Sequence, residues 1–145
     1  MFAAIMALPA LILAGVAAMA IRFMTSGHPL GGAPEKVPCA EALDFGGARL
    51  PKGAYEAECT VQVWLDTEYD VEFRMPRADV VRWLKRTYPV APEPGAESCD
   101  DGADLCLHMN SAATVPPGVD ADAVEIDVTY EEPTTARVTF FAFTV

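Results

Sequence analysis

Positive charge and histidine are both scarce in this sequence. Among 145 residues, 10 Lys and Arg stand against 21 Asp and Glu, which gives a formal net charge of −11. A chain this acidic is repelled by the phosphate backbone, so we expect no nucleic-acid binding. Only His28 and His108 supply imidazole groups, and few side chains can therefore act as bases near neutral pH.

Sequence motifs of common catalytic and metal sites are also missing. No Gly-rich phosphate loop follows a strand pattern, and neither H-E-x-x-H nor G-x-S-x-G occurs. There is no C-x-x-C pair, and the irregular spacing of the cysteines argues against a zinc site. We therefore expect a non-catalytic protein with no cofactor and no bound metal.

One long segment lacks charged side chains altogether. Residues 1–21 are apolar and rich in Ala, and as a helix they would be about 31 Å long, close to the hydrocarbon thickness of a bilayer. This predicts a hydrophobic helix over residues 1–24 that contacts a membrane through residues 1–21. Two interpretations stay open: an uncleaved single-pass transmembrane anchor, or a signal peptide cleaved after Ala20, which would make the protein secreted.

The segment that follows is rich in glycine and proline. Residues 25–38 (TSGHPLGGAPEKVP) show no periodicity and predict a linker. Residues 39–145 then form the expected folded domain, since the chain is 52% hydrophobic and long enough for one compact domain. The bias toward Ala, Val, Asp and Arg is typical of proteins from GC-rich bacteria.

The cysteines indicate the compartment. Cys39, Cys59, Cys99 and Cys106 are an even number behind a hydrophobic leader, which predicts disulfides and an extracytoplasmic location. Of the three pairings, we favour Cys39–Cys59 and Cys99–Cys106, because the second pair closes a short hydrophilic loop and the first fastens the chain leaving the linker onto a strand. Arg22 directly after the apolar run favours the opposite orientation, but one Arg is outweighed by four cysteines.

Periodicity predicts the fold class. Apolar residues alternate with polar ones over residues 55–65, 69–75 and 124–130, a short strand is expected at 105–109, and a further strand is expected at 138–145. The last of these is apolar at successive positions, which predicts a central strand covered on both faces. Together the segments predict an α+β domain: an antiparallel sheet of four or five strands with one packed helix, preceded by the N-terminal transmembrane or signal helix.

The packed helix is expected to begin at Pro76, because proline suits the first helical position, and to end before Pro89. Its apolar face is formed by Val80, Val81, Trp83, Leu84 and Tyr88.

Two features could carry an interaction. The first is a basic surface on an acidic domain, which could bind an anionic partner or lipid headgroups, although cations at a helix end are also commonly just solvated. This basic surface comprises Arg74, Arg77, Arg82, Lys85 and Arg86. The second is Trp64, which the alternation places on the outward face of its strand, either as an exposed interface aromatic or beneath a loop.

One cluster could carry chemistry. Asp104, Cys106 and His108 occupy alternate positions, so on a strand they share a face and could activate a thiolate or bind a metal. The interpretation we favour is that Cys106 is bonded to Cys99 and that His108 is a surface residue.

These observations predict a small membrane-anchored or exported protein with a non-catalytic binding role in the cell envelope and an envelope protein as partner. Two alternatives stay open. The first is a small thiol-dependent enzyme or redox protein that uses Cys106 and His108. The second is an accessory subunit of a membrane complex, recognised through its N-terminal helix.

Overall fold

The computed structural model describes residues 2–25, 32–97, 99, 102–110 and 114–145, and within the first helix it describes side chains from residue 11 onward. The chain divides into two compact units, Met1–Ala33 and Pro34–Val145. The first contains helix α1 (Phe2–Thr25), whose last residue donates a side-chain hydrogen bond from Thr25 Oγ1 to Ile21 O at 2.8 Å. Among the described residues, no helix is both long enough and apolar enough to cross a membrane.

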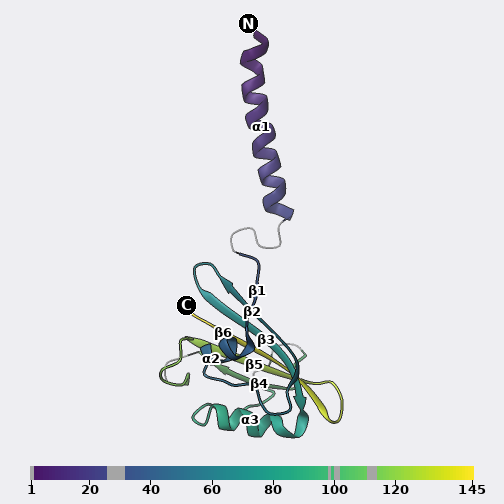
Figure 1. Ribbon diagram of the computed structural model, residues 1–145, viewed down its shortest axis with the longest axis vertical. Coiled ribbons are helices and arrows are strands. Elements are labelled where there is room, and N and C mark those ends of the chain that lie inside the picture. Colours follow the sequence, from purple (N-terminus) through teal and green to yellow (C-terminus); the bar gives the residue numbers. More distant parts are fainter. Residues whose placement is uncertain (1, 26–31, 98, 100–101, 111–113) are drawn as a thin grey trace. The chain divides into compact units, whose positions relative to one another are not determined.

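The second unit is an α+β fold built on one antiparallel sheet (Figure 1). Within the described residues the sheet has six strands in the order β1-β2-β3-β6-β5-β4. The strands are β1 (Glu35–Lys36), β2 (Tyr55–Val63), β3 (Thr67–Pro76), β4 (Leu105–Met109), β5 (Ala123–Tyr130) and β6 (Thr135–Phe143). The expected count of four or five strands was thus too low, because β1 lies within the predicted linker and pairs with β2 through its backbone.

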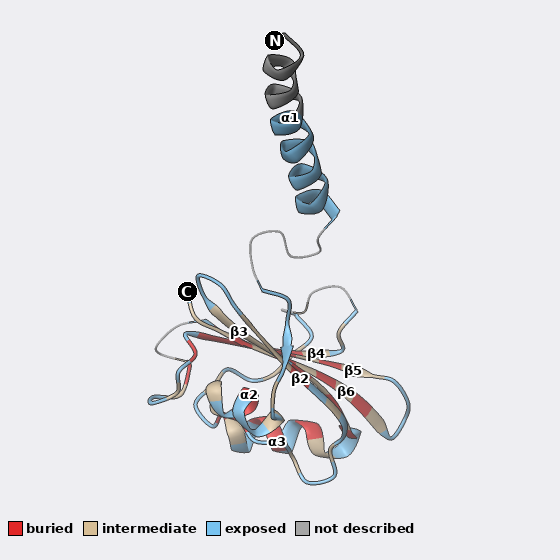
Figure 2. Ribbon diagram, turned by 45° about the horizontal axis from the view of Figure 1, so that its top comes forward, coloured by how far each residue is buried: buried red, intermediate tan, exposed pale blue. Residues whose placement is uncertain are grey.

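The expectation of one packed helix was also wrong. The described part of this unit holds α2 (Cys39–Phe45) and α3 (Val80–Thr87), with a short 3-10 segment, η1 (Arg77–Asp79), leading into α3. Both α-helices cover the same face of the sheet (Figure 2). On that face Gly46, at the end of α2, meets Phe140 of β6, and Trp83 of α3 meets Phe73 of β3.

The start of α3 differs from the expected start. Pro76 is the last residue of β3, with φ −59° and ψ 126°, so its backbone is extended and the helix forms only after it. Val80, Trp83, Leu84 and Tyr88 are buried as predicted. Val81 was assigned to the apolar face but is 42% exposed.

Strand β6 lies between β3 and β5, which agrees with the expected central position. Its residues alternate: Val138 and Phe140 are completely buried under the helices, whereas Phe141 and Phe143 are only partly buried on the opposite face. Coverage of both faces was therefore an incorrect expectation. The centroids of the Phe141 and Phe143 rings lie 5.1 Å apart. The two rings therefore cover part of each other's apolar surface on a face that no described helix covers.

Both expected disulfides are present, and they use all four cysteines of the chain. Cys39–Cys59 joins the first residue of α2 to β2. Cys99–Cys106 joins the loop before β4 to the second residue of that strand.

Candidate functional site

A cavity of about 550 Å³ lies between α3 and the loop that follows α2. Its apolar lining comes from Leu50, Pro51, Met75 and Trp83. Four cationic side chains also line it, Arg49 and Lys52 from the loop and Arg82 and Arg86 from α3, together with Asp79 and Thr87. We call the four cationic residues with their cavity the basic pocket.

The basic pocket has unneutralised positive charge. Arg82 is paired with Asp79, three residues earlier. Among the described residues, no carboxylate lies within ion-pair distance of Arg49, Lys52 or Arg86. In a chain with net charge −11, three unpaired cations around one cavity form a local positive potential that can attract an anion.

Trp83 links the two sides of the basic pocket through a ring contact and a hydrogen bond. Its indole packs edge-on against Phe73, with ring centroids 5.6 Å apart and planes at 90°. The indole Nε1–H donates a hydrogen bond to Arg49 O at 3.1 Å, which fixes the loop to the helix. A second link runs from Tyr88 Oη to Gly46 O at 2.8 Å. Burial raises the pKa of the Tyr88 phenol, so it remains protonated and donating at physiological pH.

The structure separates the five residues of the predicted basic surface. Arg82 and Arg86 line the basic pocket. Lys85 is paired with Glu93 at 2.9 Å, and the Arg77 guanidinium lies 3.8 Å from the centroid of the Tyr130 ring. The fifth residue, Arg74, lies on β3 and takes part in a different network.

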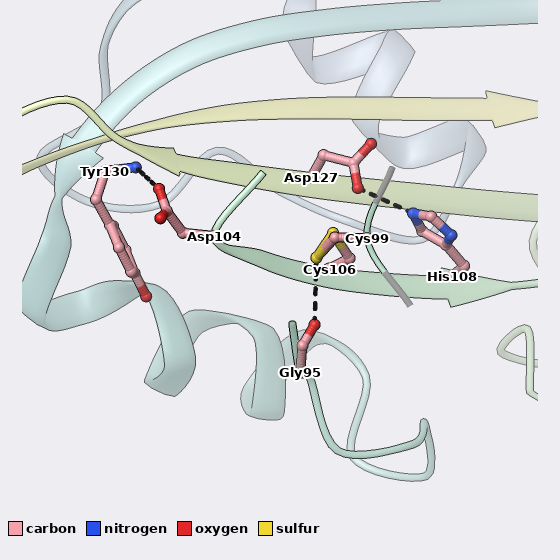
Figure 3. Close-up of a disulfide and its surroundings, with 7 residues drawn as sticks. All are labelled: Gly95, Cys99, Asp104, Cys106, His108, Asp127 and Tyr130. Carbon is pink, nitrogen blue, oxygen red and sulfur yellow. Dashed lines mark hydrogen bonds and ion pairs between the residues drawn. A yellow bond between two sulfur atoms is a disulfide. The ribbon is translucent and has the colours of Figure 1, made fainter. Parts of the chain in front are cut away.

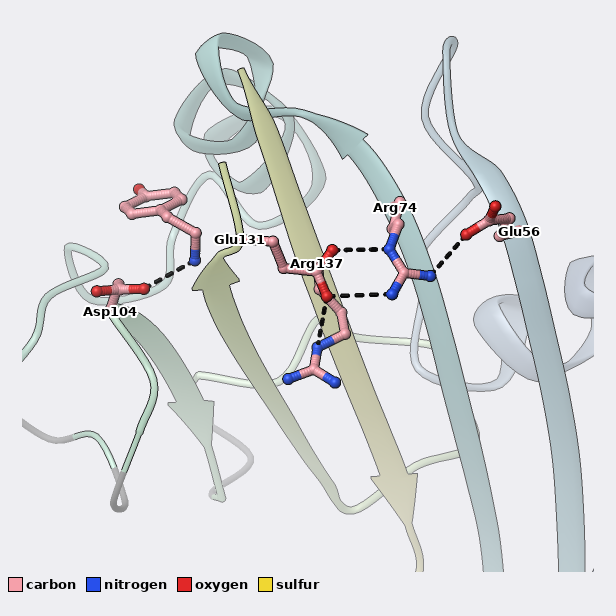
Figure 4. A network of polar contacts seen from close by, with 6 residues as sticks. Glu56, Arg74, Asp104, Glu131 and Arg137 are labelled. Atoms are coloured by element: carbon pink, nitrogen blue, oxygen red, sulfur yellow. Dashed lines mark hydrogen bonds and ion pairs between the residues drawn. The ribbon is translucent and has the colours of Figure 1, made fainter. Parts of the chain in front are cut away.

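Arg74 is neutralised by carboxylates on both sides (Figure 4). It lies 2.6 Å from Glu56 and 2.7 Å from Glu131, which also approaches Arg137 at 3.5 Å. The Arg74 guanidinium holds the pKa of the Glu131 carboxyl below its ordinary value, first through hydrogen bonding and then through charge. This network therefore ties the β5–β6 turn to β3, and its cation is not available to a partner.

A second cluster lies on the sheet face opposite the helices, at the edge strand β4 (Figure 3). His108 Nε2 lies 2.9 Å from Asp127 Oδ1 on β5. The ligand atoms of Cys106, His108 and Asp127 all lie within 4.8 Å of one another. Cys106 is buried, with 4% of its surface exposed, while His108 and Asp127 are partly exposed.

The acidic member of the predicted cluster was misidentified. Asp104 turns away and accepts a hydrogen bond from Tyr130 N at 2.7 Å. Asp127 takes its place because it is the direct cross-strand neighbour of Cys106 in the antiparallel register. As favoured, Cys106 is bonded to Cys99 and is not a free nucleophile.

Trp64 lies in the turn between β2 and β3 and is 57% exposed. Its neighbours Val63 and Leu65, which the alternation placed on the inner face, are also exposed, at 61% and 77%. The hairpin extends beyond the region that the helices cover, so both faces of its tip meet solvent. Val63, Trp64 and Leu65 therefore form a continuous exposed apolar tip.

Comparisons with protein-family models, with curated proteins and with solved structures find no match to this chain.

Proposed function

We propose that this protein is a membrane-anchored or exported binding protein whose folded domain takes an acidic segment of an envelope protein into the basic pocket, without catalysis. The observation that carries the proposal is the convergence of Arg49, Lys52 and Arg86, all unpaired with any described carboxylate, on one cavity of a strongly acidic chain. The apolar floor formed by Met75 and Trp83 supports a ligand with some hydrocarbon surface beside its charge.

The charge of the whole chain favours a small anionic group over a broad anionic surface. A bilayer of anionic lipids or a nucleic acid presents negative charge over an area larger than the pocket, and it would repel the acidic surroundings. A short run of Asp or Glu in a partner protein can place its carboxylates at Arg49, Lys52 and Arg86, while Asp79 in the same cavity stays paired with Arg82. Arginine guanidinium groups suit this role, because they bind carboxylates in a bidentate manner.

The leader and the disulfides support the location. Residues 1–21 contain no charged side chain, and the two disulfides are stable in an oxidising compartment outside the cytoplasm. Intact mass spectrometry of the native protein tests both parts: loss of the first 20 residues identifies a cleaved leader, and a gain of four hydrogen atoms on reduction identifies two disulfides. Four alkylatable thiols in the unreduced protein would contradict the proposed location.

The binding test uses the full-length chain and a short peptide of glutamate residues. We expect Arg86→Glu, which changes the net charge by −2, to lower peptide affinity by more than about tenfold, or about 1.4 kcal/mol. Lys36→Glu is the matched control, because Lys36 is an exposed cation on β1 outside the pocket, and it should change affinity little. Equal effects of both changes would mean that only net charge matters.

Three further ligands define the class of partner. A glutamine peptide of equal length should not bind. Inorganic phosphate should compete weakly, and vesicles of anionic lipid should recruit the protein no more than neutral vesicles do, since any binding through residues 1–21 is common to both. If anionic vesicles bind more protein than neutral ones and the peptide does not bind, the pocket is not a peptide site and the proposal is wrong.

A further inference from the structure

We propose that Cys106, His108 and Asp127 form a binding site for a divalent cation of the zinc class. In the oxidised protein the Cys99–Cys106 disulfide blocks this site, and reduction of the disulfide by a dithiol makes it available. The inference does not depend on the proposed function, since this cluster lies on the opposite face of the sheet from the basic pocket.

The three donors are brought together by the sheet itself. Cys106 and His108 are alternate residues of β4 and thus share a face, and Asp127 of β5 is registered directly opposite Cys106. Their donor atoms lie within 4.8 Å of one another in the disulfide form. A metal–ligand bond of about 2.0–2.3 Å places two ligands on one ion about 3–4 Å apart, so small side-chain movements suffice.

The donor chemistry selects the metal. One thiolate, one imidazole and one carboxylate form a mixed set that suits Zn²⁺ better than Mg²⁺ or Ca²⁺, which prefer oxygen ligands alone. The cluster is only partly exposed to solvent, because Cys106 is buried while His108 and Asp127 are partly exposed. A fourth position is then available to Cys99, released by the same reduction, or to water.

The disulfide controls access because a disulfide sulfur carries no charge and is a poor ligand. Cys99 is the less buried residue of the pair, so its sulfur is taken as the point of attack. One thiolate of the dithiol bonds to Cys99, and Cys106 leaves as a thiolate beside His108. The second thiol of the reductant then attacks the mixed disulfide, releases Cys99 and closes the reductant's own disulfide, so two electrons pass to the protein. The cation binds the Cys106 thiolate in place of a proton.

Cys99→Ser in the full-length chain tests the site without reductant and leaves Cys39–Cys59 intact. This variant should bind one Co²⁺ per chain, with the absorption bands of a thiolate-bound tetrahedral ion, and Zn²⁺ should displace the Co²⁺. The oxidised wild-type protein should show none of these Co²⁺ absorption bands. The same protein should show them after a dithiol has reduced the Cys99–Cys106 disulfide.

Second-site changes identify the ligands. His108→Gln added to Cys99→Ser should weaken Co²⁺ binding by more than about tenfold, which is the lower end of the loss seen when even a supporting residue of a metal site is removed. Asp104→Asn in the same background is the matched control, since the Asp104 carboxylate is occupied by Tyr130 N, and it should leave affinity unchanged. If folded Cys99→Ser protein, verified by circular dichroism, binds no Co²⁺, or if His108→Gln has no effect, the site does not exist.

Discussion

The indole Nε1–H of Trp83 donates a hydrogen bond to the backbone carbonyl of Arg49 at 3.1 Å, and this contact joins the two walls of the basic pocket. Trp83→Phe keeps an aromatic ring against Phe73 but removes the donor. We expect it to lower the free energy of unfolding by about 1–3 kcal/mol, measured in urea, because a hydrogen bond and some packing are lost. It should also weaken glutamate-peptide binding, since the loop that carries Arg49 is released.

Trp64→Phe is the control for this change. Trp64 is exposed, so its replacement should alter stability by no more than about 0.5 kcal/mol. A Trp83→Phe protein with unchanged stability and unchanged peptide affinity would show that the indole does not fix the pocket.

Gly46 is required by close packing at the end of α2. An added Cβ would lie 2.6 Å from Phe140 Cζ and 3.1 Å from Ala142 Cβ, both in the core. We expect Gly46→Ala to destabilise the domain by about 1–3 kcal/mol, because the core cannot make room without shifting α2. Gly95→Ala is the control, since no atom lies within 4 Å of its added Cβ, and a loss of equal size there would contradict the packing argument.

The sequence could predict the elements whose residues alternate. Strands β2, β3 and β5 were found from period-2 patterns, whereas β6 was found from its run of successive apolar residues. β1 could not be found this way, since its two residues are both exposed and only its backbone pairs. The seven residues of α2 are too few for a helical period to be recognised.

Sequence spacing could place neither site completely. Arg86 was identified on its helix, but Arg49 and Lys52 are distant in sequence and join it only through packing of the loop on Trp83. Likewise Cys106 and His108 share a strand, whereas Asp127 enters through strand pairing. A local pattern identifies residues on one element, and the register between elements is set by the whole fold.

Ionisation of Glu131 should contribute to stability at neutral pH. Its folded-state pKa is lowered below the ordinary value of 4.5 by Arg74, so the contribution is present above pH 4.5 and is lost as the pH falls through the lowered pKa. We expect thermal unfolding scans to show Tm decreasing in that acidic range, and Glu131→Gln to reduce this dependence.

The neighbouring Glu132→Gln is the matched control for Glu131. Glu132 is exposed, and no cation among the described residues lies within ion-pair distance of it. Its replacement should leave the acid dependence of Tm as in the wild-type protein, and a shared response of both variants would argue against the Arg74–Glu131 interaction.

The two disulfides should contribute unequally to stability. Cys39 and Cys59 are separated by 20 positions, and Cys99 and Cys106 by 7. Loop-closure entropy then predicts a loss of about 3 kcal/mol for Cys39→Ala with Cys59→Ala, and about 2 kcal/mol for Cys99→Ala with Cys106→Ala. Urea unfolding of the two double variants measures the difference, and the reverse order would show that the loop-length argument fails here.

The apolar tip of the β2–β3 hairpin offers a direct optical test of exposure and of the predicted interface. In a Trp83→Phe background Trp64 is the sole tryptophan, and at 57% exposure its emission should be red-shifted and readily quenched by acrylamide. Exposed apolar clusters of this kind commonly mark protein contacts, so a protein partner that covers the tip should shift the emission to the blue and slow the quenching. Trp64→Ser should then weaken that partner's binding while leaving the free energy of unfolding within about 0.5 kcal/mol of the wild-type value. Emission that is already blue-shifted in the isolated protein would mean that Trp64 is covered by its own chain.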